Sequence, residues 1–381
     1  MSLRVAILTD NDFSKVTGVT TTLRAVVAHA PADIVPRVYA CERREVDTAG
    51  YRAFRAPSVG IPYYRHMAMY LPPMGRLRAQ LDADGVDLLH YTTPGPMGLA
   101  AIRLSRSLPR SMVGSYHTDL AEYTRVLSGR QWLGDLFGRY MRWSYRHCSH
   151  VLVPSAATRH LATASGIDPA RVGVWVRGVS TTQFTPARRD QALRDAWRVP
   201  DGGIAVLYAG RLSVEKGLDM VPALATRLRV LGIPHRFVFV GAGPMDATLA
   251  ARCPGAVFLG ALAHDDVAVA MASADVFLFP SRTDTAGNVV LEAQASGLPV
   301  LVTPDGGPRE NMQDDVTGVI CAEVGQFAGA LAGFVRTPAR RQAMAAAARA
   351  YAMTRSWSSA LAPLYATYRE AAASIPRAGH A

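Results

Sequence analysis

Lysine is nearly absent from this sequence. It occurs only at Lys15 and Lys216, so arginine supplies almost all of the 41 basic side chains, which outnumber the 30 acidic ones and leave a formal net charge of +11. An arginine bias in a GC-rich genome explains this composition without any function. The charge is compatible with phosphates, nucleic acid or an anionic membrane surface as partners. Against this background, a lysine at a phosphate-binding spacing becomes informative.

Cysteines and long apolar runs are also scarce. The four cysteines form no C-x-x-C pair, which argues against a disulfide framework or a zinc site and favours a cytoplasmic protein. No window of about 18 uncharged apolar residues is present, so we expect no membrane-spanning helix. The first apolar run, Leu3–Leu8, is too short for a signal peptide and predicts a buried strand. Attachment to the inner face of a membrane remains compatible with these absences.

The chain of 381 residues is too long for one compact core, because domains usually contain about 100–200 residues. Apolar residues make up 49% and charged residues 19%, which supports a large core and excludes global disorder. The length therefore predicts two domains.

Short β-branched runs alternate with helical stretches, a pattern typical of parallel sheets covered on both faces. The expected strands are Val5–Thr9, Asp87–His90, Met112–His117, Val151–Pro154, Val172–Arg177, Ile204–Ala209, Phe237–Val240, Val257–Leu259, Val276–Phe279 and Val300–Thr303. The expected helices are Thr20–His29, Met97–Ser107, Ala156–Ser165, Leu218–Leu231, Val267–Ser273 and Val289–Ser296.

The alternation is interrupted once, over residues 180–203, where prolines, arginines and a Gly-Gly pair gather. We therefore predict α/β domains at 1–186 and 187–355, each a doubly wound Rossmann-like sheet, facing each other across a cleft. An alanine-rich tail from Arg340 to Ala373 predicts helices with a break near 354–358. In doubly wound sheets ligands bind beyond the carboxyl ends of the strands, so candidate residues are sought directly after each strand.

The loop after the strand 204–209 carries two cations. It contains Gly210, Arg211, Lys216 and Gly217 and leads into a helix. A helix N-terminus beside fixed cations forms an anion site. The order of residues is not that of a Walker A loop, and a solvated surface loop is the alternative.

The loop after the strand 237–240 contains Gly241 and Gly243, which allow close approach of a ligand to the backbone. Pro244 and Met245 follow, so this is not the G-x-G-x-x-G pattern of dinucleotide-binding folds. A plain turn explains the two glycines equally well.

The loop after the strand 276–279 carries two carboxylates eight residues apart, Asp284 in the loop and Glu292 about one turn into the next helix. Paired carboxylates at such a place suit hydroxyl groups of sugars. The backbone amides of Thr285–Asn288, which open the helix, face a diphosphate or sugar in this interpretation. A helix cap with a solvated glutamate is the alternative.

Two loops of the N-terminal half contain candidate site residues. His117, after the strand 112–117, suits hydrogen bonding to a substrate hydroxyl, although a lone histidine is more often structural. The loop after the first strand contains Asp10-Asn11-Asp12, a D-x-D pattern that we discount as a metal site because of its early position. We expect these residues to shape the loop, which continues to Gly18, and to cap the next helix.

The segment 131–147 predicts an amphipathic helix with an arginine face. Tryptophans at its border and arginines on one side form a pattern typical of binding to anionic lipid headgroups. An ordinary buried helix is the alternative. The candidate acceptor or membrane residues are Tyr116, Asp119, Trp132, Arg139, Arg142, Trp143 and Arg146.

Together these residues resemble glycosyltransferase family 4, the retaining enzymes of GT-B fold, over essentially the whole chain. The segment Phe279–Glu292 is similar to the family's E-x7-E motif, with Asp284 in place of the first glutamate, and Gly210–Gly217 is similar to its diphosphate loop. Ala286 stands where a phenylalanine is usual. Ser115–Asp119 and Trp175–Val179 resemble the branch of bacterial α-mannosyltransferases and sulfoquinovosyl diacylglycerol synthases, in which Ser180 is usually an aspartate.

The resemblance implies roles for the candidate residues. Arg211 and Lys216 would hold the nucleotide diphosphate, Glu292 the ribose, and Asp284 with His117 the donor sugar. Gly18 would let the first loop approach the diphosphate. Further donor-binding residues implied are Arg177, Gly210, Gly241, Gly243, Thr285, Ala286, Gly287, Asn288 and Val289. A C-terminal helix over 356–375 would pack back onto the N-terminal, acceptor-binding domain.

The expected reaction is transfer of a hexose with retention, without a metal or other cofactor. The Asp284 variant favours mannose from GDP-mannose, passed to a lipid or glycan acceptor. A transferase using a UDP-sugar, with diacylglycerol as acceptor, and a non-catalytic nucleotide-sugar-binding paralogue stay open. A nucleotide-sugar epimerase or a glycogen-type phosphorylase on the same fold is a further alternative. It is disfavoured because a phosphorylase needs a pyridoxal lysine, and Lys216, one of only two lysines, is already assigned to the diphosphate loop. Nucleic-acid binding is disfavoured because no basic stripe or reading motif is present.

Overall fold

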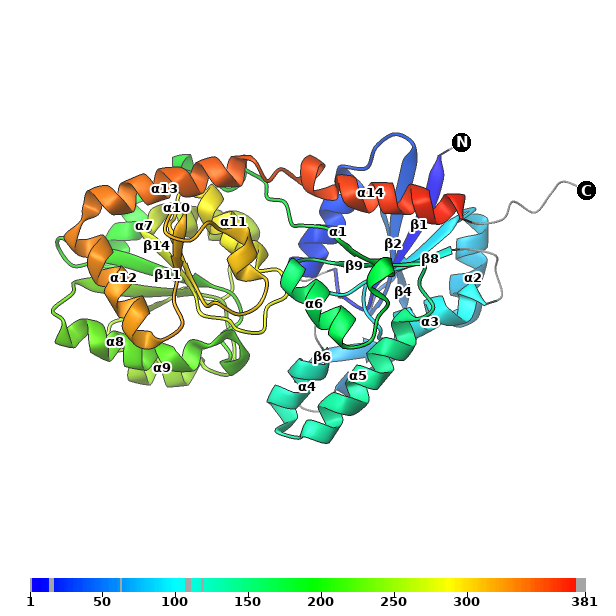
Figure 1. Cartoon of the computed structure of the whole chain (residues 1–381), viewed down its shortest axis with the longest axis horizontal. Helices are drawn as coiled ribbons and strands as arrows, with labels where there is room; N and C mark the ends of the chain where they lie inside the picture. Colours follow the sequence, from blue (N-terminus) through cyan, green and yellow to red (C-terminus); the bar gives the residue numbers. More distant parts are fainter. Residues whose placement is uncertain (1, 14–16, 62–63, 107–110, 118–119, 375–381) are drawn as a thin grey trace, which may run out of the picture. The chain divides into compact units, whose positions relative to one another are not determined.

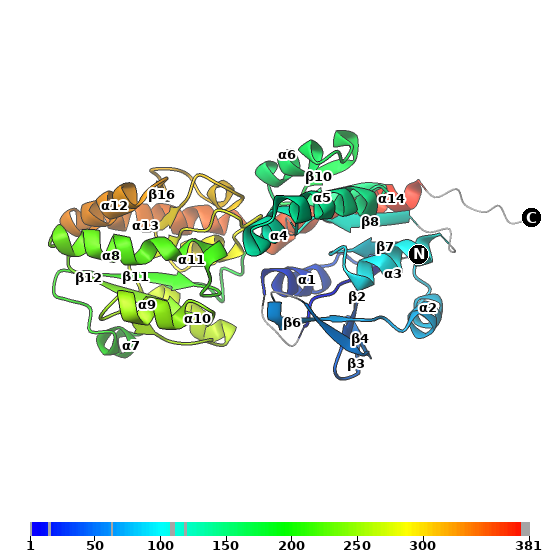
Figure 2. The ribbon, with the colours of Figure 1, turned by 90° about the horizontal axis from the view of Figure 1, so that it is seen from below.

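The computed structural model describes residues 2–13, 17–61, 64–106, 111–117 and 120–374. The chain separates into two compact units, each a sheet with helices on both faces (Figures 1 and 2). The N-terminal unit consists of Met1–Arg177 and Ala360–Ala381, and the C-terminal unit of Gly178–Ser359. The expected boundary at residue 186 is therefore too late. Residues 178–186 belong to the C-terminal unit because Phe184 is buried in its core and Val179 pairs with Ser356.

The N-terminal unit contains an eight-stranded sheet in the order β10-β9-β8-β7-β1-β2-β4-β3, with β3 as the antiparallel edge strand. Its strands are β1 (Leu3–Leu8), β2 (Ile34–Glu42), β3 (Val46–Thr48), β4 (Tyr51–Arg55), β7 (Leu88–Tyr91), β8 (Ser111–Ser115), β9 (His150–Val153) and β10 (Val172–Val174); β5 (Ser58–Ile61) and β6 (Tyr64–Tyr70) form a separate hairpin. The sequence did not predict β2, because Pro36 and Arg37 interrupt its apolar run.

Seven helices flank this sheet in the part of the unit that the structure describes. They are α1 (Gly18–Ala28), α2 (Met74–Ala83), α3 (Pro96–Ser105), α4 (Leu120–Ser128), α5 (Gln131–Tyr145), α6 (Ala156–Ala164) and the end of α14 (Trp357–Ala373). In α14, Tyr368 forms a 2.6 Å hydrogen bond with Nδ1 of His90, and Tyr365 donates to the carbonyl of Val26 at 2.8 Å. These bonds attach the C-terminal helix to the N-terminal sheet and α1 (Figure 1).

The C-terminal unit contains six parallel strands in the order β13-β12-β11-β14-β15-β16. They are β11 (Ile204–Ala209), β12 (His235–Val240), β13 (Val257–Phe258), β14 (Val276–Phe279), β15 (Val300–Val302) and β16 (Gly318–Ile320). The helices are α7 (Gln191–Ala196), α8 (Val221–Val230), α9 (Asp246–Arg252), α10 (His264–Ser273), α11 (Asn288–Ala295), α12 (Val324–Arg336) and α13 (Pro338–Met353).

The strand order decides where ligands bind in each unit. Counted within the C-terminal unit, the order is that of the Rossmann fold, and the direction of winding reverses between β11 and β14. In the N-terminal unit it reverses between β1 and β7. Such reversal points open a crevice at the carboxyl ends of the strands. The two cation- and carboxylate-bearing loops of the sequence follow β11 and β14, on either side of one reversal point.

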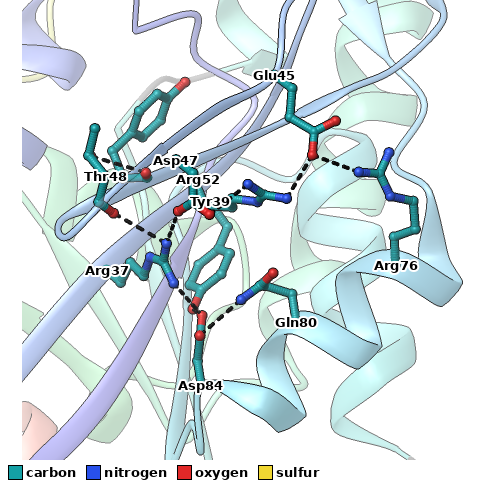
Figure 3. A network of polar contacts seen from close by, with 10 residues as sticks. Arg37, Tyr39, Glu45, Asp47, Thr48, Arg52, Arg76, Gln80 and Asp84 are labelled. Atoms are coloured by element: carbon teal, nitrogen blue, oxygen red, sulfur yellow. Dashed lines mark hydrogen bonds and ion pairs between the residues drawn. The ribbon is translucent and has the colours of Figure 1, made fainter.

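Part of the arginine excess forms ion pairs at the edge of the N-terminal sheet (Figure 3). There Arg37 contacts Asp47 and Asp84, while Arg52 contacts Asp47 and Glu45 at 2.8 and 2.7 Å. These arginines connect β2, β4 and the end of α2. They have a structural role and are not available to a ligand.

The four cysteines, Cys41, Cys148, Cys253 and Cys321, are free and buried. Within the described residues, no helix combines the length and apolarity needed to cross a membrane.

Candidate active site

The loops after β11 and β14 lie against each other at the reversal point of the C-terminal sheet. Gly217, at φ 72°, ends the first loop so close to the second that a Cβ atom would lie 2.1 Å from the carbonyl oxygen of Pro280. Thr283 donates a 3.0 Å hydrogen bond to the carbonyl of Glu215. Backbone contacts therefore fix the two loops as one surface.

An ion pair joins the two loops at their exposed side. Nζ of Lys216 lies 2.8 Å from both carboxylate oxygens of Asp284, with 23% and 22% of the two side chains exposed. The sequence interpretation gave these residues different parts of the donor, the diphosphate and the sugar. The structure brings them into direct contact. Arg211 is partly exposed in the same loop as Lys216.

The glycines after β12 have a packing role. A Cβ at Gly241 would lie 1.9 Å from the carbonyl oxygen of Gly210, and one at Gly243 2.2 Å from that of Leu212. Leu212 also exchanges backbone hydrogen bonds with this turn, donating to Ala242 and accepting from Met245. Close approach to a neighbouring loop therefore explains both glycines without a ligand.

The N-terminus of α11 follows the Lys216–Asp284 pair. Gly287 adopts φ 64° before the helix, and no N-cap side chain accepts a hydrogen bond from the first turn. Thr285, Ala286, Asn288 and Val289 are partly exposed around this turn. The helix dipole places partial positive charge here, which favours an anion beside the Lys216 loop.

A glycine pair that the sequence analysis overlooked supports this turn. Gly307 donates to the carbonyl of Asp284 at 2.9 Å, and a Cβ at Gly307 would lie 2.0 Å from the carbonyl oxygen of Thr285. Asn311 donates to the carbonyl of Ala286. The signal was present as Gly306-Gly307-Pro308 after the strand at 300–303, the same position relative to a strand as the other candidate loops.

Glu292 contacts a histidine that was also missed. Nε2 of His264 lies 3.3 Å from Oε1 of Glu292, and the Nε2 amide of Gln183 lies 3.3 Å from Nδ1 of the same ring. The amide nitrogen donates, so Nδ1 accepts and Nε2 carries the hydrogen that points to the carboxylate. His264 begins α10 after the short strand β13, which sequence periodicity located but did not connect with Glu292.

In the N-terminal unit, His117 lies after β8 against a buried arginine. Nη2 of Arg177 donates to Nδ1 of His117 at 2.9 Å, and the guanidinium lies over the Trp175 ring at 4.4 Å. His117 is 8% and Arg177 2% exposed. A guanidinium has no acceptor, so Nδ1 must accept and Nε2 of His117 carries the hydrogen.

Burial sets the charge of this pair. Burial first, and then the charges of Arg177 and His90, hold the pKa of His117 well below its ordinary value. Burial also lowers the pKa of Arg177 to about 9, so the guanidinium stays charged at neutral pH. His117 is therefore a neutral donor through Nε2. Arg177, expected to bind the donor, contacts and orients this histidine.

The first loop of the N-terminal unit also lies at a reversal point. Gly18 begins α1, which Thr17 caps by accepting from the amide of Thr20. Asp10 is partly buried, and its removal from water raises its pKa to about 6; its carboxylate accepts from the amide of Met97 at 2.8 Å. Asp10 thus caps α3 rather than the next helix along the chain. Among the described residues, no group of three or more His, Cys, Asp or Glu side chains is placed to hold a metal ion.

The acceptor and membrane candidates are not all at the surface. Tyr116 is 2% exposed and packs on Tyr145, so it is a core residue and not an acceptor contact. On α5, Trp132 is 58% exposed, and the helix carries exposed arginines and a partly buried tryptophan further on. Those residues are Arg139, Arg142, Trp143 and, just after the helix, Arg146. Asp119 lies outside the described residues.

Comparison with known proteins identifies the family. Residues 16–183 match the model of "Glycosyltransferase Family 4", and residues 203–337 that of "Glycosyl transferases group 1". The chain is 34% identical over 367 residues to a GDP-mannose-dependent alpha-mannosyltransferase of Mycobacterium tuberculosis, covering 93% of both chains. This chain belongs to glycosyltransferase family 4. Sulfoquinovosyl transferase SQD2 of Arabidopsis thaliana is 32% identical over 275 residues, which cover 71% of this chain and 52% of SQD2.

Solved structures show the same fold. Sucrose-phosphate synthase from Thermosynechococcus elongatus aligns with a TM-score of 0.78 at 17% identity, covering 97% of this chain and 98% of that one. HepE of Anabaena, solved with UDP-glucose, aligns with a TM-score of 0.77 at 18% identity, over 97% and 100% of the two chains. The glycosyltransferase therefore has the GT-B fold, and its family makes it a hexosyltransferase.

Proposed function

We propose that this family 4 glycosyltransferase moves mannose from GDP-mannose, with retention of the α-configuration, to a lipid or glycan acceptor. The observation that carries the proposal is the full-length similarity to GDP-mannose-dependent α-mannosyltransferases. Relatives of the same name from Corynebacterium glutamicum and Mycolicibacterium smegmatis are 28% and 31% identical over 97% and 93% of this chain. Asp284, in place of a glutamate, supports the same branch.

The C-terminal unit supplies electrostatic stabilisation in this proposal. Transfer breaks the bond between the anomeric carbon and a phosphate oxygen, so negative charge grows on the leaving diphosphate. Lys216, Arg211 and the N-terminus of α11 direct positive charge to one surface, where preorganised groups stabilise such a transition state. Because these groups carry the charge, the proposed chemistry requires no metal.

Asp284 has two functions in this arrangement. Its carboxylate holds Lys216 in place at 2.8 Å before the donor binds. When a diphosphate draws the ammonium group, carboxylate oxygens become available to hydroxyl groups of the donor sugar. Glu292, oriented by His264, is proposed to accept hydrogen bonds from the two ribose hydroxyls.

His117 is proposed to contact the donor sugar as a neutral donor. Its Nε2 hydrogen suits a sugar hydroxyl oxygen, and burial, together with the charge of Arg177, keeps the ring from acting as a base. We therefore assign no general base, in agreement with a front-face displacement in which the leaving phosphate accepts the acceptor's proton.

The acceptor is proposed to approach from the N-terminal unit. Trp132 and Leu136 are 58% and 52% exposed on α5, and such side chains suit an interface between water and lipid. Peripheral attachment to a membrane follows if the acceptor is a lipid.

The donor is identified by measuring release of nucleoside diphosphate and transfer of sugar with GDP-mannose, UDP-glucose, UDP-glucuronic acid and UDP-sulfoquinovose. The proposal predicts turnover with GDP-mannose alone and an α-linked mannosyl product. Turnover with UDP-sulfoquinovose in its place would favour the second candidate, sulfoquinovosyl transfer, which the similarity to SQD2 supports. If the protein neither hydrolyses nor transfers sugar from any of these donors, both proposed functions are contradicted.

A further inference from the structure

The N-terminal unit contains an arginine-lined cavity of about 400 Å³ far from the carboxyl ends of its strands. Arg139 and Arg142 come from the last turns of α5, Arg146 follows this helix on the way to β9, and Arg171 comes from the loop that leads into β10. Both connections reach the amino ends of their strands. The cavity therefore lies at the amino ends of the strands, whereas the crevice at the reversal point lies at their carboxyl ends. It is not part of the proposed donor site.

Three of these arginines form no ion pair with an acidic side chain in the part of the chain that the structure describes. At positions i, i+3 and i+7 they share one face of α5, where neighbouring like charges destabilise a helix. The nearest acidic residue on the helix, Asp135, lies 3.9 Å from Arg125. Among the described residues, no carboxylate forms an ion pair with Arg139, Arg142 or Arg146.

The network of Figure 3 is the contrast within the same unit. There Arg37, Arg52 and Arg76 share Glu45, Asp47 and Asp84, so each positive charge is compensated. The unit thus contains one group of arginines that form ion pairs within the protein and a second group, at positions 139, 142 and 146, whose charges are available to a ligand. The latter group lines a cavity.

The fourth arginine is anchored in place. Nη1 of Arg171 donates to the carbonyls of Arg146 and Cys148 at 3.3 and 3.2 Å, and its Nε lies 3.5 Å from a carboxylate oxygen of Asp168. Asp168 is the one acidic residue among those that line the cavity, so the lining keeps an excess of three positive charges.

Local geometry holds the other guanidinium groups at the rim. Arg146 lies over the Trp143 ring at 5.8 Å, and Gly166, at φ 92°, leaves room for Arg142, whose Cδ would lie 2.9 Å from a Cβ at this position. Burial, and then the charges of Arg146 and Arg106, lower the pKa of the adjacent His147. Contacts within the protein therefore position Arg146 and Arg171 before any ligand arrives.

We propose that this cavity binds a phosphate ester. Guanidinium groups bind phosphate oxygens in pairs of parallel hydrogen bonds, and the volume exceeds that of a phosphate ion and suits a small organic phosphate. The phosphate belongs either to a lipid headgroup or to a water-soluble metabolite, and both present the same chemistry to the arginines.

The test compares two double variants that remove the same charge. Arg142→Gln/Arg146→Gln alters the cavity, whereas Arg103→Gln/Arg336→Gln removes exposed arginines from the last turns of α3 and α12. A third variant, Arg142→Lys/Arg146→Lys, keeps the charge but not the planar fork. Thermal unfolding verifies that each variant is folded. Binding of glycerol 3-phosphate is measured by calorimetry, and binding to vesicles of phosphatidylcholine with or without phosphatidylglycerol by flotation.

We expect the unaltered protein to bind one of these two probes saturably, and the glutamine cavity variant to bind it roughly 100-fold more weakly, since each charge-assisted hydrogen bond lost costs about a factor of ten. The lysine variant should be intermediate and the α3/α12 variant unchanged. Binding of glycerol 3-phosphate assigns the site to a metabolite, and binding only to vesicles with phosphatidylglycerol assigns it to a headgroup. Absence of both, or equal loss in both double variants, would overturn the proposal. Donor turnover is a separate measurement, so its failure would not be mistaken for failure here.

Discussion

The carboxyl edges of the two sheets carry charge in different ways. In the C-terminal unit, Lys216 and Asp284 form an ion pair that is partly exposed and joins two loops. In the N-terminal unit, Arg177 is 2% exposed and holds a neutral His117 in one tautomer. A partly exposed pair can exchange one partner for a charged ligand, whereas a buried cation cannot leave its site. This difference is the reason for proposing that the anionic part of the donor binds to the C-terminal unit and that His117 contacts a neutral hydroxyl.

The strongest way to break this comparison is to remove the exposed cation. Lys216→Ala should lower kcat/KM for the donor by about 10²–10³-fold, the usual loss when one preorganised charge is removed from a transition state. Turnover is followed by release of nucleoside diphosphate, with Arg103→Ala as a control that removes an exposed charge elsewhere. Near-normal turnover of the folded Lys216 variant would exclude this lysine from the mechanism.

The backbone at the carboxyl edge of the C-terminal sheet is tested with two glycines, of which Gly241 donates a 2.7 Å hydrogen bond to the carbonyl of Gly260. Gly241→Ala combines φ 131° with a contact of 1.9 Å and should lower the free energy of unfolding by more than about 3 kcal/mol. Gly260→Ala, at φ 68° with open space around it, should cost only about 1–2 kcal/mol. Urea denaturation measures both. Equal losses would mean that the loops after β11 and β12 do not depend on close approach.

The N-terminal unit should respond to acid through two buried histidines. Burial lowers the pKa of His90 to about 3, and His117 also has a lowered pKa. Below about pH 6.5 the unfolded chain binds protons that the folded chain does not. The free energy of unfolding therefore decreases as the pH is lowered, by about 1.4 kcal/mol per pH unit for each histidine.

His90→Gln and His117→Gln should therefore each reduce the slope of the unfolding free energy against pH, between about pH 6 and 4.5, by about 1.4 kcal/mol per pH unit, which corresponds to one proton. Tyr365→Phe removes a neighbouring hydrogen bond but no histidine, and serves as the control. Unchanged slopes in both histidine variants would show that these side chains are accessible to protons in the folded state.

The smallest expected effect concerns the attachment of α14 to the N-terminal sheet. Tyr368→Phe removes the 2.6 Å hydrogen bond to His90 and should cost about 1–3 kcal/mol, because a buried ring nitrogen loses its partner. The same substitution at Tyr351, whose hydroxyl belongs to the C-terminal unit, leaves α14 untouched. Loss of stability in thermal unfolding only with the Tyr351 variant would contradict this attachment.

The sequence predicted the strands on which the site depends because they are continuous apolar runs. It missed β2, where Pro36 interrupts the pattern, and placed the boundary too late, since the packing of Phe184 into the second core is not visible in local composition. It singled out Lys216, Asp284, Glu292 and His117 as candidates because each follows a strand.

The partners of the site residues were harder to predict. The contacts of Lys216 with Asp284 and of Glu292 with His264 join residues 68 and 28 positions apart, which spacing alone does not reveal. The cavity of the arginines likewise depends on Arg171, which comes from another connection than α5. The sequence shows which residues follow each predicted strand. It does not show which loops lie next to each other, because that depends on the order of the strands in the sheet.

Calorimetric titration of GDP into the protein tests the central assignment most directly. The account predicts saturable binding that Lys216→Ala weakens at least about tenfold, as expected for one charge-assisted hydrogen bond, while Arg142→Gln/Arg146→Gln binds GDP as the unaltered protein does. Equal affinity of the Lys216 variant, or loss of GDP binding in the cavity variant, would contradict the assignment of the diphosphate to the carboxyl edge of the C-terminal sheet.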